Sequence, residues 1–142
     1  MIVMKPAVSS DTAMQMVRAA VGHAEAQGWQ ICAAVVDPGG VALALWRMDE
    51  VPVPVVDFAL DKAYTAATMK RSTEAFFGRM EESASLRLGL ANRARLMVWG
   101  GGLPLFHEGR IVGGIGVSGA KDFEDIACAK AAVRAAGLGW EA

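Results

Sequence analysis

Lys62 is the residue whose type and surroundings most clearly suggest chemistry. If its segment is helical, the side chains one and two turns away are apolar, namely Phe58, Ala59, Ala66 and Met69. An ammonium group on an apolar face must reach solvent, pair with an acid or bind a ligand, because burying an unpaired charge is costly. Two interpretations stay open: a structural ion pair with Asp49 or Asp125, and a contact to a ligand or substrate. Thr65 shares the same face.

Arg47 and Asp37 form a second group of candidates, at the ends of two expected strands. The guanidinium of Arg47 suits a carboxylate of a substrate, or else a salt bridge with Asp37 or Asp49. Asp37 opens an Asp-Pro-Gly-Gly turn, where its carboxylate can accept backbone N–H groups. If the protein is a cofactor-free enzyme acting on a small oxygenated organic compound, its predicted catalytic residues are Lys62, Arg47 and Asp37.

The spacing Gly114, Gly116 and Gly119 matches the GxGxxG pattern of dinucleotide-binding proteins. That pattern belongs in an early strand–helix–strand unit with an acidic residue on the next strand, whereas only one helical segment follows here. The glycines are therefore expected to let a backbone or a ligand approach closely. Ser118 lies in GVSGA rather than GxSxG, so we expect a structural or ligand-contacting role and not a nucleophile.

The histidines and cysteines show no metal-site spacing, since HxH, HExxH and CxxC patterns are absent. His107 adjoins an expected hairpin turn and should be exposed. Cys32 and Cys128 are flanked by apolar residues, which favours buried free thiols in a reducing compartment.

The pattern along the chain predicts an α/β fold with the order α-β-β-α-α-β-β-β-α and an antiparallel sheet. Arg110–Ser118 is expected to be central, because its side chains are too apolar for an edge, and both terminal helices should pack on the sheet. The helical segments are expected near residues 10–27, 56–70, 73–92 with a break near Gly78 or Ser83, and 123–136. The strands are expected at 31–36, 41–48, 95–99, 103–107 and 110–118.

Composition limits the classes of function. The chain has 142 residues, of which 54% are hydrophobic and 20% charged, with a net charge of −1. This predicts one domain over residues 1–142, no nucleic-acid partner and no membrane span. The start of the chain does not resemble a signal peptide, so we expect a cytoplasmic protein. The apolar excess predicts a homo-oligomer.

Three segments, AAVVDPGGVALALWRMD, DKAYTAATM and LPLFHEGRIVGGIGVSGAKDFEDIACA, resemble the GlcG/HbpS family. This family includes haem-binding HbpS-like proteins and corrinoid-associated PduO C-terminal domains. The resemblance implies a profilin-like fold with a five-stranded antiparallel sheet flanked by helices, and oligomers from dimer to octamer. Haem is the cofactor it implies, with His23 as an axial ligand; a solvated His23 at the rim of its helix is the alternative.

The residues and the resemblance together predict a sensor, carrier or accessory protein that binds haem, a corrinoid or a small carboxylated compound. No metal site is predicted beyond the haem ligand. The predicted ligand-binding residues are Lys62, Thr65, Arg47, Met69, Gly101, Gly102, Pro104, Gly116, Ser118, Gly119 and His23. We expect Lys62, Thr65 and Arg47 to line one pocket, together with the loop 101–104 and the backbone at 116–119.

Overall fold

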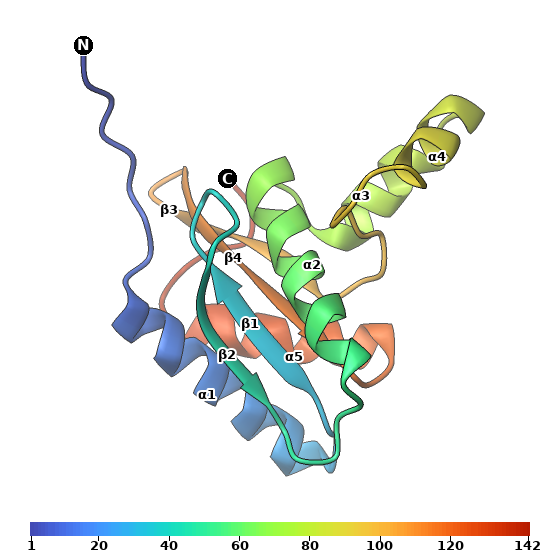
Figure 1. The fold of residues 1–142 in the computed structure, drawn as a ribbon. Helices are drawn as coiled ribbons and strands as arrows, with labels where there is room; N and C mark the ends of the chain where they lie inside the picture. Colours follow the sequence, from blue (N-terminus) through green and yellow to red (C-terminus); the bar gives the residue numbers. More distant parts are fainter.

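The computed structural model describes residues 1–142 as an antiparallel sheet of four strands between two layers of helices (Figure 1). Helices α1 and α5 cover one face of the sheet, and α2 covers the other. The strands lie in the order β2-β1-β4-β3, so β4 is central, as predicted. The elements are α1 (Ser10–Gln27), β1 (Cys32–Val36), β2 (Ala42–Arg47), α2 (Pro54–Met69), α3 (Thr73–Met80), α4 (Ala84–Leu90), β3 (Gly102–His107), β4 (Arg110–Ser118) and α5 (Asp122–Ala135).

Local sequence signals set the helix boundaries. The hydroxyl of Ser9 accepts the N–H of Thr12 at 3.1 Å and begins α1, and Gly28 ends that helix with a φ of 77°. In the same way, the hydroxyl of Ser83 accepts the N–H of Leu86 at 3.2 Å and begins α4. The predicted break in the 73–92 segment is therefore confirmed at Ser83.

The glycines of β4 allow α2 to lie directly against the sheet. A Cβ atom on Gly114 would lie 2.6 Å from the carbonyl oxygen of Ala63, and one on Gly116 would overlap the backbone of Ala59. The antiparallel sheet also lacks the strand–helix–strand unit of a dinucleotide site. The GxGxxG pattern here serves close packing of backbone on backbone.

The prediction of a five-stranded sheet was wrong, because residues 95–99 do not form a strand. Thr65 holds this segment against α2 instead: its hydroxyl donates to the carbonyl of Arg95 and accepts the N–H of Met97, both at 2.9 Å. Arg95 takes a left-handed φ of 72°, which breaks an extended conformation. The apolar run in this segment reflects packing on a helix rather than strand pairing.

The two edges of the sheet differ. The outer side of β3 is paired with the C-terminal segment, where Phe106 and Gly139 exchange two backbone hydrogen bonds of 2.8 and 3.0 Å. Strand β2 pairs only with β1, and its side chains Leu45 and Trp46 are 39% and 37% exposed. The sheet therefore has one covered edge and one free edge.

Candidate functional site

Lys62 is buried where the middle of α2 crosses the end of β4. Only 2% of the residue is exposed. Its ammonium donates to the carbonyl of Val117 at 2.9 Å, to the hydroxyl of Ser118 at 3.2 Å and to Oδ2 of Asp125 at 3.2 Å. The three protons of the ammonium thus have three partners within the protein.

Asp125, in the first part of α5, is the counter-ion of Lys62. Its Oδ1 accepts the N–H of Ala120 at 3.0 Å, so both carboxylate oxygens are engaged. Gly101 lies over the pair, and a Cβ atom there would stand 3.1 Å from the Lys62 ammonium. The pair joins α2, the end of β4 and the start of α5. Of the two interpretations of Lys62, the geometry matches the ion pair with Asp125.

Burial shifts the ionisation of both members of this pair. Loss of hydration lowers the pKa of Lys62 and raises the pKa of Asp125, while their mutual attraction acts in the opposite direction on each. A buried pair of this kind contributes little net stability compared with apolar side chains of equal volume. Perturbed groups beside a cavity mark a candidate functional site.

A cavity of about 340 Å³ adjoins the pair, and we call it the Lys62 cavity. Phe58 and Trp99 form an aromatic wall, with ring centroids 5.1 Å apart and the rings edge to face. Trp99 is 53% exposed, which is high for so large an apolar side chain. The cavity is lined by Val55, Phe58, Lys62, Trp99, Ser118, Gly119, Ala120, Asp122 and Asp125.

The prediction that Lys62, Thr65 and Arg47 line one pocket was wrong. Thr65 is fully buried, and its hydroxyl is used by the segment 95–97. Arg47 is an exposed residue at the end of β2, where it stands opposite Cys32, which in turn stands opposite Ser118. Two strand spacings, roughly 10 Å, therefore separate the backbone of Arg47 from that of Ser118.

Asp37 takes the role of a turn residue. Its Oδ1 accepts the N–H groups of Gly39 at 2.8 Å and Val41 at 3.1 Å. Arg47 makes no ion pair with Asp37 or Asp49, so the predicted salt bridge is also wrong. Lys62, Arg47 and Asp37 lie at three separate places in the fold.

The other predicted ligand residues are dispersed. Gly101, Gly116, Ser118 and Gly119 surround the Lys62 side chain or its cavity, and Gly102 lies beside the Lys62 backbone. Met69 is 38% exposed at the end of α2 and lines a different groove. Pro104 is buried in β3 opposite Gly114.

His23 lies on the opposite side of the sheet from Lys62. It is a half-buried residue of α1, and its ring centroid is 5.9 Å from that of Trp29. His23 does not line the Lys62 cavity. The structure therefore does not bring it together with the Lys62 cavity.

Six of the nine residues that line the Lys62 cavity were not predicted from the sequence as site residues, and Asp125, Phe58 and Trp99 are the three that shape it most. Asp125 was expected only as one of two candidate partners of Lys62, and Phe58 only as an apolar neighbour on the helix. Phe58 and Lys62 are four residues apart on one helix, and this spacing was the sequence signal that Phe58 would lie beside Lys62 in the aromatic wall. Trp99 carried no signal, because its position depends on the 95–97 segment being held on α2.

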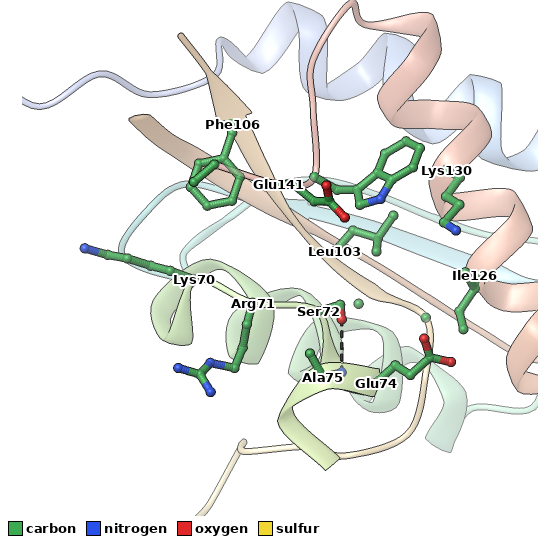
Figure 2. A pocket seen from close by; sticks show the side chains of 14 residues that line it. Lys70, Arg71, Ser72, Glu74, Ala75, Leu103, Phe106, Ile126, Lys130 and Glu141 are labelled. Carbon is green, nitrogen blue, oxygen red and sulfur yellow. Dashed lines mark hydrogen bonds between the residues drawn. The ribbon is translucent and has the colours of Figure 1, made fainter. Parts of the chain in front are cut away.

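Figure 2 shows a second cavity, whose volume is about 440 Å³. We call it the Trp140 cavity. Gly101, Gly102 and Leu103 form part of its wall, together with α5, the junction between α2 and α3, and the C-terminal residues 140–142. Two of the predicted ligand-binding glycines thus line this cavity.

The chain contains no group of three or more His, Cys, Asp or Glu side chains arranged to hold a metal ion. Cys32 and Cys128 are free and buried, as predicted, and burial raises their pKa values to about 11 and about 12. Their thiols are therefore poor nucleophiles. None of the helices has the length and apolar character needed to cross a membrane.

Comparison with known proteins settles the family. The family model described as haem degrading protein HbpS-like matches residues 8–134. The chain belongs to the HbpS-like family. The resemblance predicted from the three sequence segments is thereby confirmed.

Relatives of this HbpS-like protein differ in size. An uncharacterized 15.0 kDa protein of the dhaT-dhaS intergenic region of Citrobacter freundii is 39% identical over 100 residues, which are 70% of each chain. Corrinoid adenosyltransferase PduO of the same organism is 32% identical over 123 residues, which are 85% of this chain but 36% of PduO. The crystal structure of a PduOC:heme complex matches with a TM-score of 0.88 and 28% identity, covering 96% of this chain and 99% of that one.

Proposed function

We propose that this HbpS-like protein binds a small, uncharged oxygenated organic compound in the Lys62 cavity and acts as a sensor, carrier or accessory protein. The observation that carries this proposal is a buried, hydrogen-bonded ion pair beside a cavity with an exposed aromatic wall. A cavity that combines apolar walls with a few convergent polar groups is the usual form of a small-molecule site.

The groups around the cavity define the chemistry of the ligand. The Ser118 hydroxyl can donate to a carbonyl or hydroxyl oxygen, and the rings of Phe58 and Trp99 can cover a short carbon chain. The carboxylates of Asp122 and Asp125 outnumber the single ammonium of Lys62. A ligand carboxylate would therefore meet repulsion here, so a neutral ketone, aldehyde or polyol fits better than an acid.

The ion pair serves to position this site. Because Lys62 holds the Val117 carbonyl and the Ser118 hydroxyl, it fixes the end of β4 at the cavity mouth. A rigid site loses less conformational entropy when a ligand binds. The alternative of a cofactor-free enzyme has less support, because Lys62, Arg47 and Asp37 are not assembled in one place.

The test is a titration of the full chain with hydroxyacetone, followed by NMR chemical shifts, with acetate as the charged comparison. We expect shifts near Ser118 and Trp99 for hydroxyacetone and weaker binding of acetate. Trp99→Ala and Ser118→Ala should each weaken binding several-fold, whereas Trp46→Ala, on the other face, should not. Absence of shifts around the cavity at about 10 mM hydroxyacetone would overturn the proposal.

Haem is a second candidate ligand, favoured by the haem-degrading family to which the chain belongs and by its likeness to PduOC in complex with heme. The imidazole of His23 is a chemically suitable iron ligand, and Trp29 lies beside it. However, His23 lines neither the Lys62 cavity nor the Trp140 cavity. Haem bound at His23 would therefore lie outside these two cavities, on the α1 side of the sheet, where a second protomer could cover the porphyrin.

A haemin titration tests this second proposal. Binding through His23 should give a sharp Soret band that is lost in His23→Ala and retained in His107→Ala, which changes the other histidine. A band that persists in His23→Ala would exclude His23 as the ligand. No band at all would exclude haem binding by this protein.

A further inference from the structure

We propose that Thr65 is a positioning residue of the Lys62 cavity, which acts on ligand binding through Trp99. Its hydroxyl holds the segment that carries Trp99, so that the indole ring stays in place as one wall of the cavity. This inference rests on the proposed function of the Lys62 cavity and adds to it a residue that does not touch the ligand. Thr65 is fully buried and does not line the cavity, so its effect on a ligand must pass through another side chain.

The Trp99 side chain is only weakly fixed by its own contacts. The residue is 53% exposed, and its ring meets the ring of Phe58 edge to face, with the centroids 5.1 Å apart. A side chain that buries less than half of its surface gains little from packing, because the stabilisation follows the apolar area removed from water. The position of the Trp99 ring therefore depends on how the backbone around it is held.

The backbone is anchored on both sides of Trp99. Before it, the hydroxyl of Thr65 accepts the N–H of Met97 at 2.9 Å. After it, the carbonyl of Gly101 accepts the N–H of Val117 at 2.9 Å. Only three residues, with Trp99 in the middle, lie between these two anchors. The indole is thus carried on a short bridge, and the loss of either anchor would let the ring move.

One face of α2 controls both ends of this bridge. Lys62 and Thr65 are three positions apart on the helix, so their side chains share a face. Lys62 acts on the second anchor, because its ammonium donates to the carbonyl of Val117 at 2.9 Å. Thr65 holds the first anchor directly. Removing the Thr65 hydroxyl therefore frees one end of the bridge while the ion pair and its contact to Ser118 remain.

Arg95 shows that the segment ahead of Trp99 is held against its own backbone preference. It takes a left-handed φ of 72°, and such strain persists only where surrounding contacts impose it. Three contacts with α2 do so here. The Arg95 carbonyl accepts the Thr65 hydroxyl at 2.9 Å, the guanidinium lies 3.9 Å from the centroid of the Tyr64 ring, and Nε is 3.4 Å from Oδ1 of Asp61. Loss of the Thr65 hydroxyl removes the contact to the backbone itself.

The test measures hydroxyacetone affinity of the full chain by NMR, at a temperature well below the unfolding transition of each variant. Thr65→Val keeps the shape of the side chain and should weaken binding about two- to tenfold, the range of one aromatic contact. Thr65→Ser keeps the hydroxyl and should bind like the parent protein. The matched control is Thr68→Val, whose hydroxyl donates to the Tyr64 carbonyl within α2, and it should leave the affinity unchanged. Added to Trp99→Ala, Thr65→Val should cause no further loss, because both changes remove the same wall.

The indole N–H signals of the four tryptophans give a second readout that needs no ligand. Thr65→Val should move or broaden the Trp99 signal, identified by its absence in Trp99→Ala, and leave the other three in place. An unchanged Trp99 signal, an unchanged affinity in Thr65→Val, or an equal loss of affinity with and without Trp99 would overturn the inference. Absence of hydroxyacetone binding in the parent protein would instead refute the proposed function, and the indole signal would still decide whether Thr65 positions Trp99.

Discussion

Replacement of Lys62 by methionine isolates the role of the buried ion pair. Methionine preserves the length of the side chain and removes the ammonium. Asp125 then remains 2% exposed without a cation, and the Val117 carbonyl and Ser118 hydroxyl lose their donor. Removing one member of a buried pair costs about 3–5 kcal/mol. For a chain of this length, that lowers the melting temperature by roughly 10 °C.

The pH dependence of this loss identifies its cause. Burial already raises the pKa of Asp125, and without Lys62 only the Ala120 N–H still favours the charged form. A carboxyl whose pKa is raised in the folded state stabilises that state below its unfolded pKa and loses the contribution as pH rises. Lys62→Met should therefore regain stability as pH falls from neutral toward 4, by about 1.4 kcal/mol per pH unit over the window where only the folded carboxyl is protonated.

Urea unfolding of the parent protein and the variant at pH 7 and pH 5 measures both effects. The double variant Lys62→Met/Asp125→Asn retains the acceptor for Ala120 without a buried charge, so it should recover most of the loss at pH 7. A loss below about 1 kcal/mol in the single variant, or one that is equal at both pH values, would refute a buried charged pair.

The packing, the thiols and the exposed aromatic residues lead to four more expected outcomes. Gly116→Ala should destabilise the protein by about 3 kcal/mol in thermal unfolding, because the new Cβ overlaps the Ala59 backbone. Thr65→Val should cost about 2 kcal/mol and expose the 91–99 segment to limited proteolysis, since Arg95 and Met97 lose their partner. Cys32 and Cys128 should resist iodoacetamide at pH 8 until urea is added, and stability should fall as pH rises from about 9 to 11, where only the unfolded thiols ionise. Light scattering should give a mass well above the 14.9 kDa of one chain, since Trp46, Phe77 and Trp99 are 37%, 47% and 53% exposed.

Much of the fold could be predicted because short-range signals agree with its long-range packing. The capping Ser9 and Ser83, the terminal Gly28 and the apolar run of β4 each act locally, and each element appears where those signals place it. The segment 95–99 shows the limit of such signals. Its apolar residues fit a strand, but Thr65, thirty positions earlier, holds the segment on a helix.

The candidate site was harder to predict for the same reason. The helical spacing around Lys62 showed that its side chain points into the protein, and this was correct. Which acid it meets depends on how α5 docks beside β4, and the pattern of one helix cannot decide that. The position of Arg47 was predicted wrongly. It lies at the end of β2, two strands away from the end of β4 that borders the Lys62 cavity.

The unequal edges of the sheet bear on how copies of this protein can associate. A strand edge with free N–H and C=O groups can extend its sheet by pairing with another such edge. Here β3 is already occupied by Gly139, and only β2 is free. Two copies joined through β2 would form one continuous sheet, with a β3 strand at each end that carries the Phe106–Gly139 bridge. Further extension of that sheet would have to pair β3, where this bridge already takes up part of the edge.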